Sequence, residues 1–478
     1  MNALRDALFG VFLFLVSFGL RLAAALRFAG EPVWDGHYYD FGAHRIAEGF
    51  GYSDDIVVEG ARVWHPWCHY PVGYSAYLGA FYKLFGGAPI VAHVADSLAG
   101  ALLAVFTFLL AREALSPLRA RVAGLLVALH PGLILWGALL MSEPLSALLV
   151  LAAFWAALRT KRSAFGERRP LAAVAIGALV LGVATLVRPQ ALLCAPLLAL
   201  AYPARDLRAR LGAVAIACGV TLLPVLPWTA RNCSVMDGCA LVSTNAGWNL
   251  AIGSFPRATG RFETLRSSDG CREVTGQVQQ DRCWLAYGFD HILEHPWRWL
   301  SLVPAKLGFT FDHESFEVEY LHEARPSAWP EDRRVLARGM TTAMHRLLVV
   351  ASALACVGIA LGSRARRDDR VEKQARLVQG AMLGFVGLVA AVGAARDAAT
   401  FWPVVLLACA LPWIRLPGRP SAPPAILMCA GLVATIVVTH AVFFGEDRYH
   451  VVATPALCLL AAAGLRETRR LREARARA

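Results

Sequence analysis

Charged residues are scarce in this sequence of 478 residues. Asp, Glu, Lys and Arg together make up 17% of the chain, hydrophobic residues make up 57%, and the mean hydropathy is +0.49. This composition excludes a wholly soluble protein, because too much apolar surface would face water. It is also too polar for membrane spans alone. The composition therefore predicts a polytopic membrane protein with at least one sizeable aqueous part.

Three other patterns are missing. No two cysteines have the CxxC spacing, which argues against a cysteine-based metal site. No solenoid repeat is visible, nor an inverted repeat of the kind found in many transporters. No convincing small-residue cleavage site accompanies the apolar run 7–26. We therefore expect this run to be a first transmembrane helix that serves as an uncleaved signal.

Apolar runs dominate what is present, and they predict about twelve transmembrane helices, to within one or two. The runs are 7–26, 89–111, 121–139, 143–158, 170–187, 190–203, 211–228, 341–361, 377–395, 399–414, 423–443 and 450–465. The expected fold is an all-α polytopic membrane protein with a small periplasmic loop domain.

The net charge of +12 follows from membrane topology rather than from a nucleic-acid partner. With the amino terminus in the cytoplasm, more than half of the Lys and Arg residues fall in cytoplasmic connections and the carboxyl-terminal tail, as the positive-inside rule requires. We expect an N-terminal transmembrane module over 1–228 with its first periplasmic loop at 27–88. A periplasmic loop domain over 229–340 and a C-terminal transmembrane module with a basic tail over 341–478 would follow.

Four cysteines of the second long loop have spacings that suit local disulfides in an oxidising compartment. The expected pairs are Cys233 with Cys239 and Cys271 with Cys283. Other pairings remain open from sequence.

Two acids, Asp35 and Asp40, follow the first apolar run in EPVWDGHYYDFGAHRIAEGFG. A carboxylate held close to the hydrocarbon of a many-span protein is costly, which suggests a functional reason. The alternative is structural, because Asp35 stands where it would cap the helix that follows. Glu143 and Arg188 occupy short turns on the same expected side, where snorkelling to the interface is the competing explanation.

An ordered set of motifs resembles the bacterial glycosyltransferase family 39 branch of the GT-C superfamily, which includes protein O-mannosyltransferases and the lipid A aminoarabinose transferase. The motifs are WDGHYYDFGAHRIAEGFGYS, YPVGYSAYLGAFYKLFG, SEPL, VRP, ARN followed by STNAGWNLAIGSFPRATG, HPWRWLSLVPAKL and RYHVVATPALCLLAAAGL. The resemblance implies a GT-C-type bundle in the bacterial inner membrane. It also implies an inverting transferase that moves a sugar from a polyprenyl-phosphate-linked donor to a glycan, lipid or protein acceptor on the periplasmic face.

The resemblance also implies roles for single residues. Asp35 matches the first-loop acid, which is expected to act as general base on the acceptor or to position it, since an attacking hydroxyl must lose a proton. Glu143 matches a second acid that orients this region or helps to hold a divalent ion; no cofactor is certain, and a divalent metal ion is left open. The leaving lipid phosphate needs cations, and Lys306 and Arg231 are the first choices because both lie in stretches that match the family. The candidates for binding the substrate or its phosphate are Tyr38, Tyr39, Asp40, His69, Arg188, Arg231, Asn245, Asn249, Lys306 and Arg448.

One departure from the family pattern stands at His69 and Tyr70. The aminoarabinose-transferase branch has an acid–Lys pair there, so the sequence argues against aminoarabinose transfer to lipid A. The other functions left open are an oligosaccharide ligase that uses a lipid-linked glycan, a lipid or sugar transporter (flippase), and a scaffold.

Overall fold

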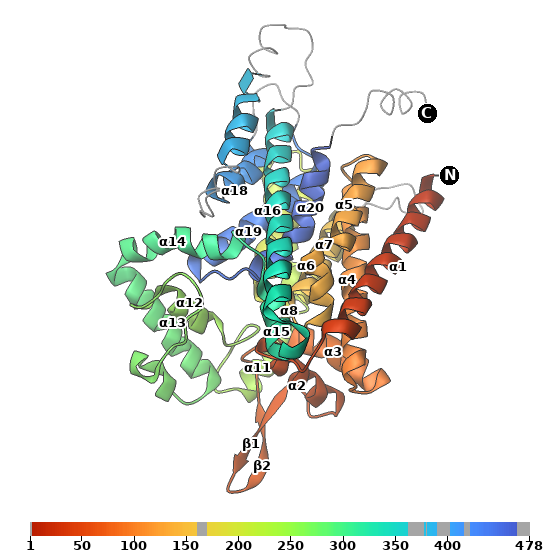
Figure 1. Cartoon of the computed structure of the whole chain (residues 1–478). Helices are drawn as coiled ribbons and strands as arrows, with labels where there is room; N and C mark the ends of the chain where they lie inside the picture. The colour runs from red at the N-terminus through yellow and green to blue at the C-terminus, as the bar shows by residue number, and fades with distance from the viewer. Residues whose placement is uncertain are drawn as a thin grey trace.

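In the computed structural model, the described residues are 2–159, 170–361, 377–378, 380–389, 402–414 and 421–465. They form a helical bundle with one small hairpin (Figure 1). The helices of the first half are α1 (Asn2–Phe28), α2 (Asp35–Ala47), α3 (Val72–Phe85), α4 (Pro89–Arg112), α5 (Pro117–Leu129), α6 (Pro131–Leu135), α7 (Glu143–Leu158), α8 (Pro170–Val187), α9 (Ala195–Leu198), α10 (Leu207–Leu222) and α11 (Leu226–Val235). The later helices are α12 (Ala246–Ser254), α13 (Gln277–Glu294), α14 (Pro296–Phe311), α15 (Phe316–Ala324), α16 (Glu331–Leu361), α18 (Trp402–Ala410), α19 (Pro424–Val442) and α20 (Thr454–Ala463).

Five of these helices, α1, α4, α8, α16 and α19, are long and apolar enough to cross a membrane. The number rises to seven if two bent helix pairs, α5 with α6 and α10 with α11, each form one span. Such helices indicate a multi-pass membrane protein. The structure therefore bears out part of the predicted set of about twelve spans. The remaining apolar runs form shorter helices, and the runs 377–395 and 399–414 lie partly outside the described residues.

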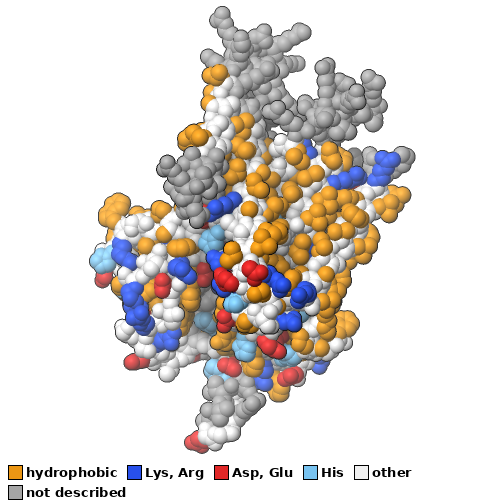
Figure 2. Space-filling view, in the orientation of Figure 1, with side chains coloured by type: hydrophobic (Ala, Val, Ile, Leu, Met, Phe, Trp, Pro, Cys, Tyr) orange, Lys and Arg blue, Asp and Glu red, His pale blue; other side chains and the backbone are white. Residues whose placement is uncertain are grey.

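The two ends of the bundle differ in character. The start of α1 and the end of α20 lie at one end, whereas α2, the hairpin and the α12–α13 region lie toward the other (Figure 1). Figure 2 shows hydrophobic side chains covering the bundle and charged side chains gathered below it. Helix α1 exposes Leu8, Val11 and Leu15. Only 22% of the most apolar 18-residue stretch of this helix is buried inside the protein. A surface of this kind is suited to lipid contact.

The hairpin consists of β1 (Ser53–Val58) and β2 (Ala61–Pro66), paired antiparallel from Ser53 opposite Pro66 to Val58 opposite Ala61. Its two-residue loop has positive φ at both Glu59 (50°) and Gly60 (85°). This backbone geometry matches the twist of the two strands. The hairpin projects away from the bundle (Figure 1).

Arg21 and Asp96 are charged side chains inside predicted spans, and both have partners. Arg21 of α1 is buried and donates to Ser17 Oγ at 2.5 Å and to the Val127 carbonyl at 3.0 Å, near the end of α5. Asp96 of α4 accepts a hydrogen bond from the Tyr74 hydroxyl at 2.7 Å. These contacts tie α1 to α5 and α3 to α4, since a polar group in apolar surroundings requires a hydrogen-bond partner.

Both expected cysteine pairs are bonded in the structure. Cys233 joins Cys239 where α11 ends, and Cys271 joins Cys283 of α13. Cys68 is a buried free thiol.

We predict that replacing Cys271 and Cys283 together by serine lowers the stability of the protein. Loss of this cross-link is expected to cost about 2–4 kcal/mol, because the unfolded chain gains freedom. Thermal unfolding of the purified protein in detergent, with and without reductant, measures the effect. Cys218→Ser, at a half-buried free thiol in α10, is the matched control. An equal shift in both variants would contradict a stabilising role for the bridge.

Candidate functional site

A cavity of about 390 Å³ is lined by residues of α2, α8, α12 and α19 and of the turn that follows α19. We call it the Asp35 cavity. It brings together seven residues singled out from the sequence: Asp35, Tyr39, His69, Arg188, Asn245, Asn249 and Arg448.

Asp35 is the first residue of α2, and its side chain makes two strong contacts. The Tyr70 hydroxyl donates a hydrogen bond to Oδ1 at 2.8 Å, and Arg448 Nη1 donates one to Oδ2 at 2.6 Å. The preceding residue, Trp34, adopts a positive φ of 51°, a strained conformation for a bulky side chain. Gly36 then packs so closely on the Tyr320 hydroxyl that a β-carbon would lie 2.2 Å from it. The start of α2 is thus fixed by tertiary contacts, and its carboxylate faces Tyr70 and Arg448.

The contacts of Asp35 set its charge. Burial by itself would raise the pKa of this carboxyl group, but the positive charge and hydrogen bond of Arg448, with the hydrogen bond from Tyr70, hold the pKa below its usual value of 3.8. A lowered pKa means that the folded protein favours the ionised form. The stabilisation is therefore present at neutral pH and is lost only as the pH falls through this lowered pKa.

Arg448 contacts several acidic and aromatic groups at once. Its Nε lies 2.9 Å from Glu446 Oε2, and Nη2 donates to the Tyr449 hydroxyl at 3.2 Å. The guanidinium also lies over the rings of Phe316 and Tyr449. Its side chain is 14% exposed. A cation held this way has a fixed position beside the cavity.

A second acid–arginine pair, Glu143 with Arg188, also contributes to this cavity through its arginine. Arg188 Nη1 is 2.7 Å from Glu143 Oε1, and the Glu143 side chain is fully buried. The same nitrogen donates to Ser142 Oγ at 3.1 Å, and that hydroxyl lies 3.4 Å from the Tyr39 hydroxyl. Glu143 therefore supports Arg188, and through Ser142 it is linked to Tyr39 of the cavity wall.

Polar groups from two other segments complete the lining. His69 packs edge-on against Tyr70 and Trp248, and burial lowers its pKa, so the ring is neutral at physiological pH. Asn245 precedes α12 and Asn249 lies within it. The apolar part of the wall includes Leu193, Ile252, Phe262, Phe443 and Phe444.

The remaining predicted residues lie outside the lining of this cavity. Tyr38 is 46% exposed and stacks on Tyr70. Arg231 donates to the carbonyls of Trp67 and Tyr52, at 3.0 and 2.6 Å. Lys306 of α14 is buried and donates to the Val442 carbonyl at 3.1 Å.

Burial and the nearby charge of Arg298 lower the pKa of Lys306 to about 7. Arg231 and Lys306 therefore bind main-chain carbonyls of neighbouring segments, and so hold those segments together.

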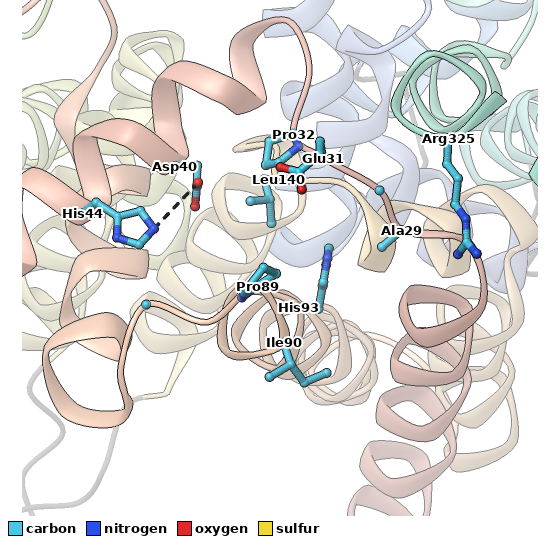
Figure 3. A pocket seen from close by; sticks show the side chains of 12 residues that line it. Ala29, Glu31, Pro32, Asp40, His44, Pro89, Ile90, His93, Leu140 and Arg325 are labelled. Carbon is cyan, nitrogen blue, oxygen red and sulfur yellow. Dashed lines mark ion pairs between the residues drawn. The ribbon is translucent and has the colours of Figure 1, made fainter. Parts of the chain in front are cut away.

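Asp40 belongs to a different cavity, of about 490 Å³, shown in Figure 3. Its carboxylate accepts a hydrogen bond from the Tyr82 hydroxyl and lies 3.9 Å from His44 Nε2. His93 and Arg325 line the same space. Asp35 and Asp40 thus line separate cavities.

Several residues of the Asp35 cavity region were not among the candidates. Tyr70 and Glu446 contact Asp35 or Arg448 directly, and Tyr449 and Trp248 supply aromatic walls. Tyr70 and Trp248 are the sequence neighbours of the candidates His69 and Asn249. Their position in the motifs could therefore have identified them as residues of the site.

A separate buried group of side chains could hold a metal ion. Glu314, His345 and His450 each offer a ligand atom, and these atoms lie within 4.8 Å of one another.

No family model and no curated protein matches the sequence. Among solved structures, an oligosaccharyltransferase of Archaeoglobus fulgidus, tethered with an acceptor peptide, matches at 14% identity and a TM-score of 0.47. The match covers 96% of this chain and 49% of the other. This chain therefore spans about half the length of that enzyme.

Two further structures have lower scores. The Archaeoglobus fulgidus enzyme with an inhibitory peptide and a dolichol-phosphate has 13% identity, coverage of 97% and 50%, and a TM-score of 0.46. ArnT from Cupriavidus metallidurans, bound to undecaprenyl phosphate, has 15% identity, coverage of 93% and 77%, and a TM-score of 0.35. These are GT-C glycosyltransferases, the superfamily that the motifs resemble. At these identities and TM-scores, the likeness assigns no activity or residue role to this chain.

We predict that Glu143→Ala destabilises the protein by about 3–5 kcal/mol, because it removes the partner of a nearly buried arginine. The double variant Glu143→Leu with Arg188→Met is expected to lose less, since it leaves no unpaired charge. Thermal unfolding of the purified variants measures both losses. A double variant less stable than Glu143→Ala would contradict a coupled pair.

Proposed function

We propose that this protein is a membrane glycosyltransferase that moves a sugar from a polyprenyl-phosphate-linked donor to an acceptor hydroxyl, with inversion at the anomeric carbon. The observation that carries the proposal is the pairing of Asp35 with Arg448 at the wall of a cavity that Arg188 also lines. A base and two cations beside one cavity are what such a transfer needs. The sequence motifs support the same reaction class.

In this reaction Asp35 acts as the general base. The acceptor oxygen attacks the anomeric carbon, its proton passes to the Asp35 carboxylate, and the bond from that carbon to the phosphate oxygen breaks. Inversion in one displacement requires no covalent enzyme intermediate, so one base is sufficient. Because Asp35 is ionised in the folded protein, it can accept this proton.

The departing lipid phosphate gains negative charge as the bond breaks. Arg448 and Arg188 are fixed by carboxylates on one side and border the cavity on the other. Fixed cations stabilise charge that develops in the transition state without having to reorganise. We assign both arginines to the leaving phosphate.

Arg448 also links the phosphate to the base. A carboxylate paired with a cation is a weak base, since the cation favours its ionised form. A donor phosphate that shares Arg448 draws part of that positive charge away from Asp35. The pKa of Asp35 then rises, so the base strengthens when the donor is bound.

The rest of the cavity suits the two halves of the donor. Asn245, Asn249 and His69 carry polar groups for sugar hydroxyls. Phe262, Phe443 and other apolar side chains form a wall on which isoprene units could pack. We place this site on the periplasmic face of the bacterial inner membrane, because both long loops lie opposite the basic cytoplasmic segments of the sequence.

A ligase that takes a lipid-linked glycan would use the same base and cations, so an assay with single-sugar donors separates it from the transferase. A transporter typically exposes charges to a pathway in the middle of the membrane. Here Arg21 and Asp96 are bonded within the bundle. This disfavours the transporter.

We predict that Asp35→Asn lowers turnover by about 10²–10⁴-fold, because an amide cannot accept the proton. The amide oxygen can still accept the hydrogen bond from Arg448, so folding and donor binding should be kept. The assay follows release of undecaprenyl phosphate from a panel of radiolabelled undecaprenyl-phosphate sugars, with purified protein and membrane extract as the acceptor.

Asp40→Asn is the matched control, since Asp40 lies on the same helix but lines the other cavity. It is expected to keep turnover. Turnover in Asp35→Asn equal to that of the wild type would remove Asp35 from the role of base. Failure of the wild type to release lipid phosphate from any donor would favour the ligase or the transporter.

We predict that Arg448→Gln lowers turnover by about 10²–10³-fold. Arg448→Lys should lower turnover less, because lysine keeps the positive charge but cannot form the paired hydrogen bonds of a guanidinium. Removing the cation should also raise the pKa of Asp35, so the acidic limb of the pH–rate profile moves to higher pH in Arg448→Gln. An unmoved limb would mean that Arg448 does not tune the base.

A further inference from the structure

A cluster of buried side chains lies outside the Asp35 cavity. Glu314 precedes α15, His345 belongs to α16, and His450 lies in the short 3₁₀ turn 449–452. All three side chains are at most 1% exposed. Glu314 Oε2 is 3.5 Å from His450 Nε2 and 3.8 Å from His345 Nδ1.

Among the described residues, none of the facing atoms has a hydrogen-bond partner. This holds for both oxygens of Glu314, for His345 Nδ1 and for His450 Nε2. Buried polar atoms without partners are costly and rare, so each one requires an explanation. The separations are long for hydrogen bonds. They are close to the spacing of about 3.3–3.5 Å that two ligands have across a tetrahedral zinc ion.

The outer nitrogens fix which tautomer each histidine adopts. His345 Nε2 lies 2.9 Å from the Phe311 carbonyl, and His450 Nδ1 lies 2.7 Å from the Thr310 carbonyl. A carbonyl can only accept, so the proton of each neutral ring is on the outer nitrogen. Both inner nitrogens therefore direct a lone pair toward Glu314. This arrangement is typical of metal-binding histidines, whose second nitrogen donates to a backbone carbonyl.

A third histidine has the opposite tautomer. His130 Nδ1 accepts a hydrogen bond from the Leu133 amide, so its Nε2 carries the proton and faces Glu314 Oε2 at 3.8 Å. His130 is therefore suited to orient the carboxylate and not to bind the metal.

The Glu314 main chain is also fixed. Its carbonyl accepts hydrogen bonds from the hydroxyls of Thr341 and Thr342 on α16, at 2.5 and 3.1 Å. These bonds hold the main chain of Glu314 against α16. Glu317 of α15 buries two further carboxylate oxygens without partners, and both acids pack against Gly132. One divalent cation would compensate much of this buried negative charge.

We propose that Glu314, His345 and His450 bind a structural zinc ion. Two imidazoles and a carboxylate are ligands that zinc prefers. The ion would join α16 to the segment before α15 and to the turn that carries His450. The proposal does not depend on the transfer reaction.

The test uses the full chain without a polyhistidine tag, stripped with chelator, incubated with one equivalent of zinc chloride, desalted, and measured for metal content. We expect about one zinc ion per wild-type chain. His345→Gln and His450→Gln should hold almost none. His291→Gln, on α13 and outside the cluster, is the matched control and should keep the ion.

His130→Ala tests the orienting role. It should weaken zinc binding by about 10- to 100-fold without abolishing it, as measured by competition with a chromophoric chelator. If the ligand variants do not fold, X-ray absorption of the zinc-loaded wild type decides, with two imidazoles and oxygen ligands expected.

Two results would overturn the proposal. One is a wild-type chain that retains no zinc after desalting. In that case a protonated Glu314 explains the cluster, since burial and the nearby charge of Asp447 raise the pKa of this carboxyl group well above its usual value. The other is equal zinc content in His345→Gln, His450→Gln and the wild type, which would place the ion elsewhere.

Discussion

A charge buried among apolar helices is stable only where the protein itself replaces the water that the charge has lost, and this constraint accounts for most of the site. Asp35 has Arg448 and Tyr70 as partners, and Glu143 has Arg188. The first pair joins elements 413 positions apart, and the second joins the start of α7 to the end of the next helix, α8. The electrostatic requirement therefore also fixes how α2, α7, α8 and the turn after α19 are arranged around one cavity.

The two pairs differ in what they can do. Glu143 is fully buried, so its bond to Arg188 holds the cation in place. The Asp35 side chain is 23% exposed and borders the cavity, so a bound molecule can reach it. One pair thus acts as a support and the other as a reactive group, although both consist of an acid and an arginine. Sequence alone could not separate these roles, since exposure depends on tertiary packing.

Features that depend on local sequence were the ones that could be predicted. Apolar runs gave the helices, and Asp35 stood out as an acid beside a span. Asp40 was harder to place, because five residues along a helix correspond to about 140° of rotation and point it to another cavity. Arg231 and Lys306 bind carbonyls of segments far away in sequence. The Glu314 cluster joins several elements, so no local pattern marked it.

The pair at the centre of the site spans 413 positions of the chain. During synthesis the carboxylate of Asp35 is made early, and its cation arrives only when α19 and the following turn have been made. Until then the cavity lacks Phe443, Phe444, Arg448 and Tyr449 from its wall. A chain cut short before this turn has an acid without its cation. The cavity is therefore completed only when nearly the whole chain has been made, so a truncated chain lacks a complete site.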